Sequence, residues 1–168
     1  MAAEVGPPGD VRVGWGFDIH PLVPGRSLRL GGVVIPFEMG LAGHSDGDAL
    51  LHAIIDALLG AAELGDIGTL FPDTAPELRG ADSRGLLREA AARVRARGFE
   101  IAFIDAVVIA EAPQVAPWRE AMVSAVREAL GQPALPVSIK GKRAEGIGEV
   151  GRGRAIACLA TVTLRRTG

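Results

Sequence analysis

The most strongly patterned stretch of the chain is residues 46–60, where apolar residues fill most faces of a predicted helix. Asp48, His52 and Asp56 are spaced four apart, which places them in one polar stripe along that helix. A helix that is so apolar elsewhere is mostly buried, and a buried polar stripe must be paired or coordinated because unpaired burial is costly. The sequence therefore predicts a buried helix that carries part of the chemistry.

Shorter runs on both sides of this helix predict the remaining elements. Alternation and β-branched content indicate strands, while Gly and Pro mark the breaks, including those predicted at Pro21 and Pro24. Helices and strands in this order indicate an α+β fold: a single domain over residues 11–168 with helices layered on one face of a mixed β-sheet. The predicted strands are 11–17, 28–30, 33–35, 99–110, 137–140 and 155–164, the further helices are 82–97 and 117–130, and the loops are 36–45, 61–81 and 141–153.

Composition excludes several classes of protein. With 168 residues, 48% of them hydrophobic, the chain is long and apolar enough for one folded domain with a full core. A net charge of −2 leaves no general electrostatic footprint for nucleic acid, and the single cysteine rules out an intrachain disulfide and a cysteine-based zinc site. No apolar run reaches about 18 residues, so no membrane span is indicated. Residues 1–10 are predicted to be a disordered leader, and the expected location is cytoplasmic.

Two histidines and an aspartate form a candidate metal site. Asp18 and His20 are two apart at a strand end, so their side chains point to the same side, and His52 would join them from the helix. One carboxylate with two imidazoles is a common catalytic zinc set that leaves the fourth position for substrate. Alternatively, Asp18 and His20 merely close the strand and His52 pairs with Asp56. In the metal interpretation, Asp48 and Asp56 are candidates for orienting His52.

Two other stretches are suited to phosphate. Ser45 and Asp46 are predicted to cap the central helix, and His44 beside them lies where helix N-terminal N–H groups attract anions. The Gly-rich segment 141–154 could cradle phosphates with backbone N–H groups and cations, or could be a solvated turn. Glu145 within it could help hold Mg²⁺, which prefers one or two carboxylates plus phosphate oxygens.

Four stretches together resemble one known family, the 2-C-methyl-D-erythritol 2,4-cyclodiphosphate synthases. They are GFDIH (16–20), AGHSDGDALLHAIIDALLGAAELGDIGTLFPDT (42–74), ADSRGLLREA (81–90) and GIGEVGRGRAIAC (146–158). The resemblance covers about residues 11–165, and the first two stretches are the most specific. It implies a metal-dependent cyclisation of 4-diphosphocytidyl-2-C-methyl-D-erythritol 2-phosphate that releases CMP, in non-mevalonate isoprenoid biosynthesis.

The resemblance also implies a homotrimer with active sites between subunits, and a mean hydropathy of +0.27 agrees with apolar surface buried between chains. It implies zinc on Asp18, His20 and His52, with Mg²⁺ or Mn²⁺ at the substrate diphosphate held with the help of Glu145. His44 and Arg143 are the catalytic candidates. The expected substrate contacts are Asp18, Ile19, His20, His44, Ser45, Asp66, Ile67, Gly68, Phe71, Pro72, Asp73, Thr74, Ala75, Ala110, Glu111, Ala112, Pro113, Gln114, Val115, Ala116, Lys142, Arg143, Ala144, Glu145, Glu149 and Arg152.

Two positions depart from the family. Lys142, Arg143 and Ala144 stand where the family usually has a pair of threonines, so a cation is predicted to replace the missing hydroxyl at the diphosphate. Glu149 stands where the family usually has a Phe that lines a cavity on the three-fold axis, and Arg152 is predicted to pair with it. Two alternatives to cyclisation remain: a metal-dependent phosphohydrolase, and a non-catalytic trimeric module that binds diphosphates.

Overall fold

Three antiparallel pairs of strands and one parallel pair build the main sheet of the computed structural model, which describes residues 9–72 and 74–167. The strand order is β4-β1-β7-β5-β6, and the β5–β6 pair is the parallel one, so the sheet is mixed as predicted. The strands are β1 (Val11–Pro24), β2 (Leu28–Leu30), β3 (Val33–Ile35), β4 (Met39–Leu41), β5 (Phe99–Ile109), β6 (Val137–Lys142) and β7 (Ala155–Arg166). The β2–β3 hairpin forms a separate two-stranded sheet, as its Gly-Gly turn predicts.

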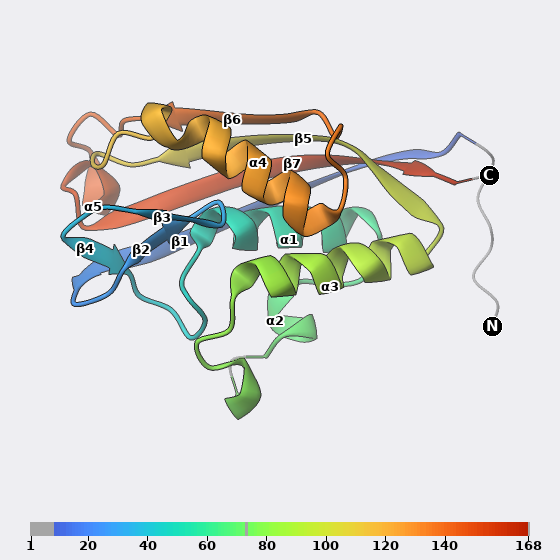
Figure 1. Ribbon diagram of the computed structural model, residues 1–168, viewed down its shortest axis with the longest axis horizontal. Helices are drawn as coiled ribbons and strands as arrows, with labels where there is room; N and C mark the ends of the chain where they lie inside the picture. Colours follow the sequence, from blue (N-terminus) through green and yellow to red (C-terminus); the bar gives the residue numbers. More distant parts are fainter. Residues whose placement is uncertain (1–8, 73, 168) are drawn as a thin grey trace.

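The helices cover one face of this sheet (Figure 1). Helix α1 packs against β1 and β7, α4 packs against β6, and α3 packs against both α1 and α4. The single α+β domain with helices on one face is therefore confirmed. The helices are α1 (Ala49–Ala61), α2 (Ile67–Leu70), α3 (Ser83–Ala96), α4 (Arg119–Leu130) and α5 (Gly148–Gly151), with 3₁₀ turns at Pro76–Leu78 and Ala116–Trp118. In the described part of the chain, no helix is long and apolar enough to cross a membrane.

Two glycines let α1 lie unusually close to β1. A Cβ atom added at Gly14 would lie 2.0 Å from the carbonyl oxygen of Ala57, and one at Gly16 would lie 2.1 Å from that of Ala53. Both glycines face α1, as do Asp18 and His20 further along the same side of the strand, because side chains alternate along β1. The close approach therefore also sets how near the helix comes to the polar end of the strand.

Asp48 joins the start of α1 to the β2–β3 hairpin. The residue is completely buried, and its Oδ1 accepts from the N–H of Gly31 (2.8 Å) and of Leu51 (3.0 Å). Its Oδ2 accepts from the N–H of Gly32 (2.7 Å). Burial raises the pKa of Asp48, although these three N–H groups favour the charged form. Asp48 is the N-cap of α1, so the prediction that Ser45 and Asp46 cap this helix was wrong. Gly47, at φ 78°, turns the chain between Asp46 and Asp48.

The structure corrects the end of one predicted strand and adds one short strand and two short helices within predicted loops. Strand β1 continues through Pro21, because the strand changes partner there: Pro21 is the last residue paired with β7, and Leu22–Pro24 pair with β4 instead. Strand β4 itself lies within the predicted loop 36–45 and is only three residues long. Helix α5 lies within the predicted loop 141–153 and α2 within the predicted loop 61–81; both are four residues long and carry little periodic signal.

The face of the sheet opposite the helices carries a row of apolar side chains. Alternate residues of β1 point to this side, and their exposed fractions range from 45% for Phe17 to 68% for Trp15. A row of this kind is typical of a surface that contacts another chain. The row consists of Val11, Val13, Trp15, Phe17 and Ile19.

Candidate active site

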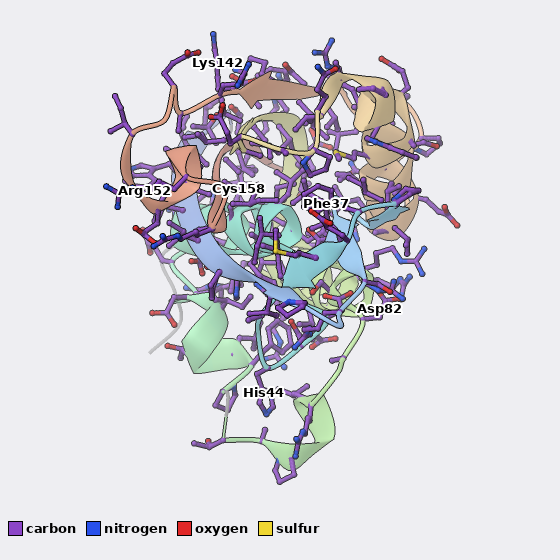
Figure 2. All side chains as sticks on the ribbon, turned by 90° about the vertical axis from the view of Figure 1, so that its left-hand side faces the viewer. Phe37, His44, Asp82, Lys142, Arg152 and Cys158 are labelled. Atoms are coloured by element: carbon purple, nitrogen blue, oxygen red, sulfur yellow. The ribbon has the colours of Figure 1, made fainter. Side chains whose placement is uncertain are left out.

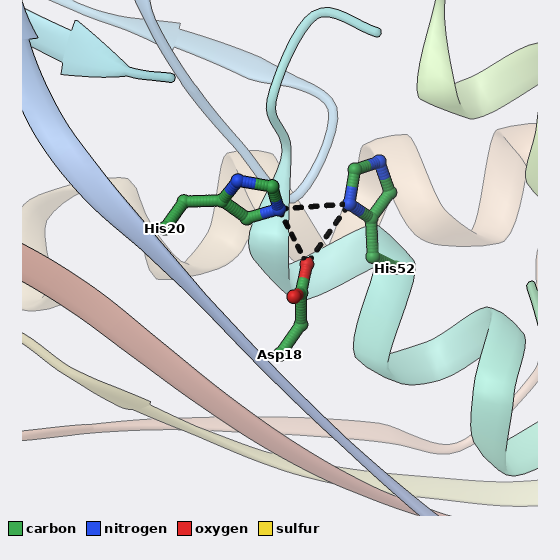
Figure 3. A group of neighbouring side chains, drawn as sticks. All are labelled: Asp18, His20 and His52. Atoms are coloured by element: carbon green, nitrogen blue, oxygen red, sulfur yellow. Dashed lines mark hydrogen bonds and ion pairs between the residues drawn. The ribbon is translucent and has the colours of Figure 1, made fainter. Parts of the chain in front are cut away.

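Asp18, His20 and His52 converge where β1 passes the first turn of α1, so the predicted place of Asp18 and His20 at a strand end was wrong (Figure 3). The Oδ2 atom of Asp18 lies 2.8 Å from Nε2 of His20 and 2.9 Å from Nδ1 of His52, and the two ring nitrogens are 3.3 Å apart. One ligand atom from each residue lies within 4.8 Å of the others. His52 is in the first turn of α1 and has only 8% of its surface exposed. The predicted trio is therefore brought together by the contact between β1 and α1.

The other hydrogen bonds of His20 show that the three converging atoms suit a cation. Nδ1 of His20 lies against the carbonyl oxygen of Ala42, which only accepts, so the neutral ring carries its proton there. Its Nε2 then presents a lone pair to the carboxylate of Asp18 and to Nδ1 of His52. Lone pairs that meet in this way repel unless a proton or a metal ion lies between them, and a carboxylate with two imidazoles is a common zinc set.

The charges of the trio are coupled. Burial works against ionisation of Asp18, but the imidazoles of His20 and His52 beside it outweigh burial and hold the pKa of Asp18 well below its usual range. Burial also works against a charged His20, yet the hydrogen bond to Asp18 raises the pKa of that ring above its ordinary value. The carboxylate is thus ionised in the folded chain, as a metal ligand must be.

A cavity of about 270 Å³ opens above these three residues. Five further residues that the sequence predicted for substrate contact line it: His44, Ser45, Ile67, Gly68 and Phe71. Sequence reasoning missed Gly43, Leu78 and Leu86, and none of these three has a local signal beyond being small or apolar. Asp56 lines the cavity but accepts from the N–H of Ile67 (2.8 Å), and Asp48 is committed to the hairpin. Neither aspartate therefore orients His52, contrary to the expectation.

The remaining predicted contacts near this cavity have other surroundings. Ile19 points to the open face of the sheet, with 46% of its surface exposed. Asp66 caps α2 by accepting from the N–H of Thr69 (2.7 Å). The side chain of Thr69, and after it this backbone N–H, lower the pKa of Asp66. Pro72, Thr74 and Ala75 follow α2 and line neither this cavity nor the one described next. Asp73, like residues 1–8 of the predicted leader, lies outside the described residues.

A second cavity, of about 510 Å³, follows the end of β5. It brings together the predicted segment Ala110–Ala116 with Lys142 and Arg143, and it adds Arg119, which the sequence did not single out. Nε of Arg143 donates to Oε1 of Glu111 (2.9 Å), and Nη2 of Arg143 donates to the same oxygen. The hydrogen bonds from Arg143 hold the pKa of Glu111 below its usual value.

The two cavities share no lining residue and lie apart in one chain. Figure 2, which views this end of the molecule, shows His44 low in the picture beside the loop after α2 and Lys142 at the opposite side of the same end. Ala144, Glu145, Glu149 and Arg152 line neither cavity. Glu149 is paired with Arg152 (3.1 Å) and Arg154 (3.4 Å), which confirms the predicted Glu149–Arg152 pair within one chain.

Two arginines border His44 without having been predicted. Nη1 of Arg26 donates to the carbonyl oxygen of Gly43 (3.0 Å), and its Nη2 donates to that of Ser45 (2.9 Å), so this side chain clamps the loop that carries His44. Arg79 lies on the other side of a shallow pocket shared with Arg26, His44 and Ser45. Lone arginines in loops are common on protein surfaces, so the sequence held no signal for them.

Fold and site together define a small α+β protein whose cavity holds a carboxylate and two imidazoles arranged to bind a metal ion. Residues 11–165 match the sequence profile of the YgbB family. The chain belongs to this family, and the resemblance seen in its sequence motifs is thereby confirmed.

Individual relatives support the same family. A protein of Aromatoleum aromaticum named 2-C-methyl-D-erythritol 2,4-cyclodiphosphate synthase is 58% identical over 157 residues, covering 94% of this chain and 95% of that protein. The structure of the bifunctional IspDF from Campylobacter jejuni matches with a TM-score of 0.91 and 41% identity over 95% of this chain, which spans 43% of that longer chain. A Plasmodium falciparum IspF–CDP complex matches with a TM-score of 0.82 and 34% identity, covering 94% of this chain and 97% of that one.

Proposed function

We propose that this protein is a phosphorus–oxygen lyase that converts 4-diphosphocytidyl-2-C-methyl-D-erythritol 2-phosphate into 2-C-methyl-D-erythritol 2,4-cyclodiphosphate and CMP, in isoprenoid biosynthesis. The observation that carries this proposal is the metal-ligand trio in a cavity bordered by His44 and Ser45. It occurs in a chain that is 58% identical to a protein named for this product.

The reaction needs positioning more than acid–base chemistry. An oxygen of the 2-phosphate attacks the β-phosphorus of the diphosphate in the same molecule, and the bond between that phosphorus and the bridging oxygen breaks. CMP leaves with the bridging oxygen and its electron pair, so no water is consumed. Because nucleophile and leaving group belong to one molecule, folding the substrate into the cavity converts positioning into rate.

Each group of residues has a proposed task. Asp18, His20 and His52 hold zinc, and Glu145 helps to hold Mg²⁺ or Mn²⁺ at the diphosphate. When bound, these ions orient phosphate oxygens and neutralise the charge that builds up during transfer. His44 and Ser45 contact the phosphate of the methylerythritol, and residues 66–68 hold its sugar part. Residues 71–74 belong to the loop over the substrate, and the backbone of residues 110–116 receives the cytosine.

The separation of the two cavities supports a shared active site. In one chain the metal-ligand cavity and the candidate cytosine cavity have no residue in common, so we propose that a neighbouring chain completes each site. The row of exposed apolar residues on β1 supplies a surface for such an assembly. The family resemblance sets the number of chains at three.

Light scattering on the purified protein at micromolar concentration is expected to give the mass of a trimer. A stable monomer would contradict the shared site.

Mixing of two variants provides a sharper test, because chains that carry His52→Ala and chains that carry Arg143→Ala damage opposite halves of a shared site. After the two impaired preparations are unfolded together and refolded, mixed trimers should have more activity than either preparation alone, whereas sites confined to one chain would show no gain.

Arg143→Ala is expected to lower turnover by about a hundredfold while zinc remains bound, because removal of a donor to charge that develops in the transition state has about this effect. The guanidinium borders the cytosine cavity and is always charged. Arg143→Lys keeps the charge but loses the paired donors, so its turnover should lie between that of the wild type and that of Arg143→Ala. Turnover of Arg143→Ala near the wild-type value would show that this side chain serves only its ion pair with Glu111.

Product identification tests the proposed function as a whole. The protein is incubated with the cytidyl substrate, zinc and Mg²⁺, and the products are identified by mass. Cyclic diphosphate and CMP in equal amounts are expected. Inorganic phosphate in place of a cyclic product would favour the phosphohydrolase, and binding of CMP without turnover would favour the non-catalytic module.

A further inference from the structure

The second ring nitrogen of His52 lies on the side of the ring away from Asp18 and His20, against a pair of buried serines. Nε2 of His52 lies 3.0 Å from Oγ of Ser83 and 3.1 Å from Oγ of Ser45. Ser83 is the first residue of α3 and is completely buried, and Ser45 is also buried. These contacts bring a histidine of α1 against the start of α3 at the side opposite to Asp18 and His20.

The proton of the Ser83 hydroxyl is committed to a carboxylate. Oγ of Ser83 donates to Oδ1 of Asp46, and the backbone N–H of Ser83 donates to Oδ2 of the same residue (3.2 Å). An ionised carboxylate only accepts, so the hydroxyl must be the donor in this contact. The Ser83 oxygen then has only lone pairs left for His52. If Nε2 of His52 carried no proton, lone pairs would face each other across 3.0 Å in a buried place.

We propose that Asp46 and Ser83 are positioning residues that keep the proton of His52 on Nε2, so that its Nδ1 lone pair is directed at the metal. The inference rests on the proposed metal site and deepens it. Ser45 is compatible with this arrangement as a second acceptor, because its Oγ also accepts from the N–H of Gly47 (3.3 Å). The Ala42 carbonyl does the same for His20, so both imidazoles of the trio have their tautomers set from outside the cavity.

A purely structural role for Asp46 is the alternative, because it also ties the loop before α1 to α3. The cap of α3 itself is Asp82, which accepts from the N–H of Arg84 (3.0 Å) and is exposed. Asp82→Ala is therefore a matched control: it disturbs the same helix end and leaves His52 and both serines in place.

The test measures zinc affinity by competition with a chromogenic chelator. Asp46→Ala frees the Ser83 hydroxyl to donate to Nε2, and Ser83→Ala removes the acceptor, so each should raise the zinc dissociation constant about 10- to 100-fold, as is usual for partners of metal-ligating histidines. The zinc dissociation constant of the double variant should be little higher than that of the single variant that binds zinc less tightly, because the two residues act through one chain of hydrogen bonds. Asp82→Ala should bind zinc within twofold of wild type, and all variants should bind CMP normally.

Three results would overturn the proposal. They are unchanged zinc affinity in both single variants, multiplying effects in the double variant, and an equal loss in Asp82→Ala. Should the variants not fold, the zinc-loaded wild type decides the matter by ¹H–¹⁵N NMR of its histidine rings. A slowly exchanging proton on Nε2 of His52 is expected; a proton on Nδ1, with the metal on Nε2, would contradict the assignment directly.

Discussion

His52→Ala is expected to release the bound zinc and to lower turnover by about a thousandfold or more, while the chain stays folded. The variant removes one of three converging ligand atoms, and loss of a metal ion that stabilises the transition state by several kcal/mol corresponds to a factor of this size. Metal analysis of the purified variant, with circular dichroism to check the fold, makes the measurement.

His44→Ala is the matched comparison for this variant. His44 lines the same cavity but is not part of the ligand trio, so the variant should keep its zinc and lose activity through substrate contact alone. Full zinc occupancy in His52→Ala would show that the metal is bound at another site. The trio would then be a hydrogen-bonded cluster within β1 and α1 that holds no metal.

Gly16→Ala is expected to destabilise the protein by about 3 kcal/mol or more, the upper part of the range for overpacked cores. The added methyl group would lie 2.1 Å from the carbonyl oxygen of Ala53, which is helix backbone and cannot turn aside as a side chain would. Helix α1 must move away from β1, and His52 moves with it. For a domain of this size the melting temperature should fall by about 6–12 °C, and zinc affinity should fall as well.

Gly60→Ala controls for the loss of a glycine as such. Gly60 is exposed in the last turn of the same helix, and a Cβ there meets no atom within 4 Å. Because alanine restricts the unfolded chain and favours a helix, this variant should be more stable by about 0.4–1 kcal/mol. If Gly16→Ala had the same melting temperature as the wild type, the contact between β1 and α1 would not be as close as described.

Local spacing was enough to predict the trio that could hold a metal ion. Strand period two placed Asp18 and His20 on one side, and helix period four singled out His52, so the trio was visible although its members are 34 residues apart. The same reasoning failed for Asp48 and Asp56, which share the stripe with His52. Each turn of the helix faces a different neighbour: the hairpin at Asp48 and α2 at Asp56.

Contacts between distant segments explain what the sequence did not reveal. Strand β4 is three residues long and forms only because β1 continues past Pro21 to meet it. The partners of His52 come from a loop and from the start of α3, 37 residues apart, and their serines and aspartate look like ordinary cap residues. In the sequence, Gly14 and Gly16 are typical of an alternating strand and give no sign of the close contact that the backbone of α1 makes with them.

The most direct test of cyclisation is to run the reaction in water enriched in oxygen-18 and to measure the mass of both products by mass spectrometry. A 2-phosphate of the same molecule is the nucleophile in this account, so neither the cyclic diphosphate nor CMP should gain a labelled oxygen. Hydrolysis must place one solvent oxygen in a product. An unlabelled cyclic product beside unlabelled CMP is the predicted result, and a heavy oxygen in CMP or in released phosphate would contradict it.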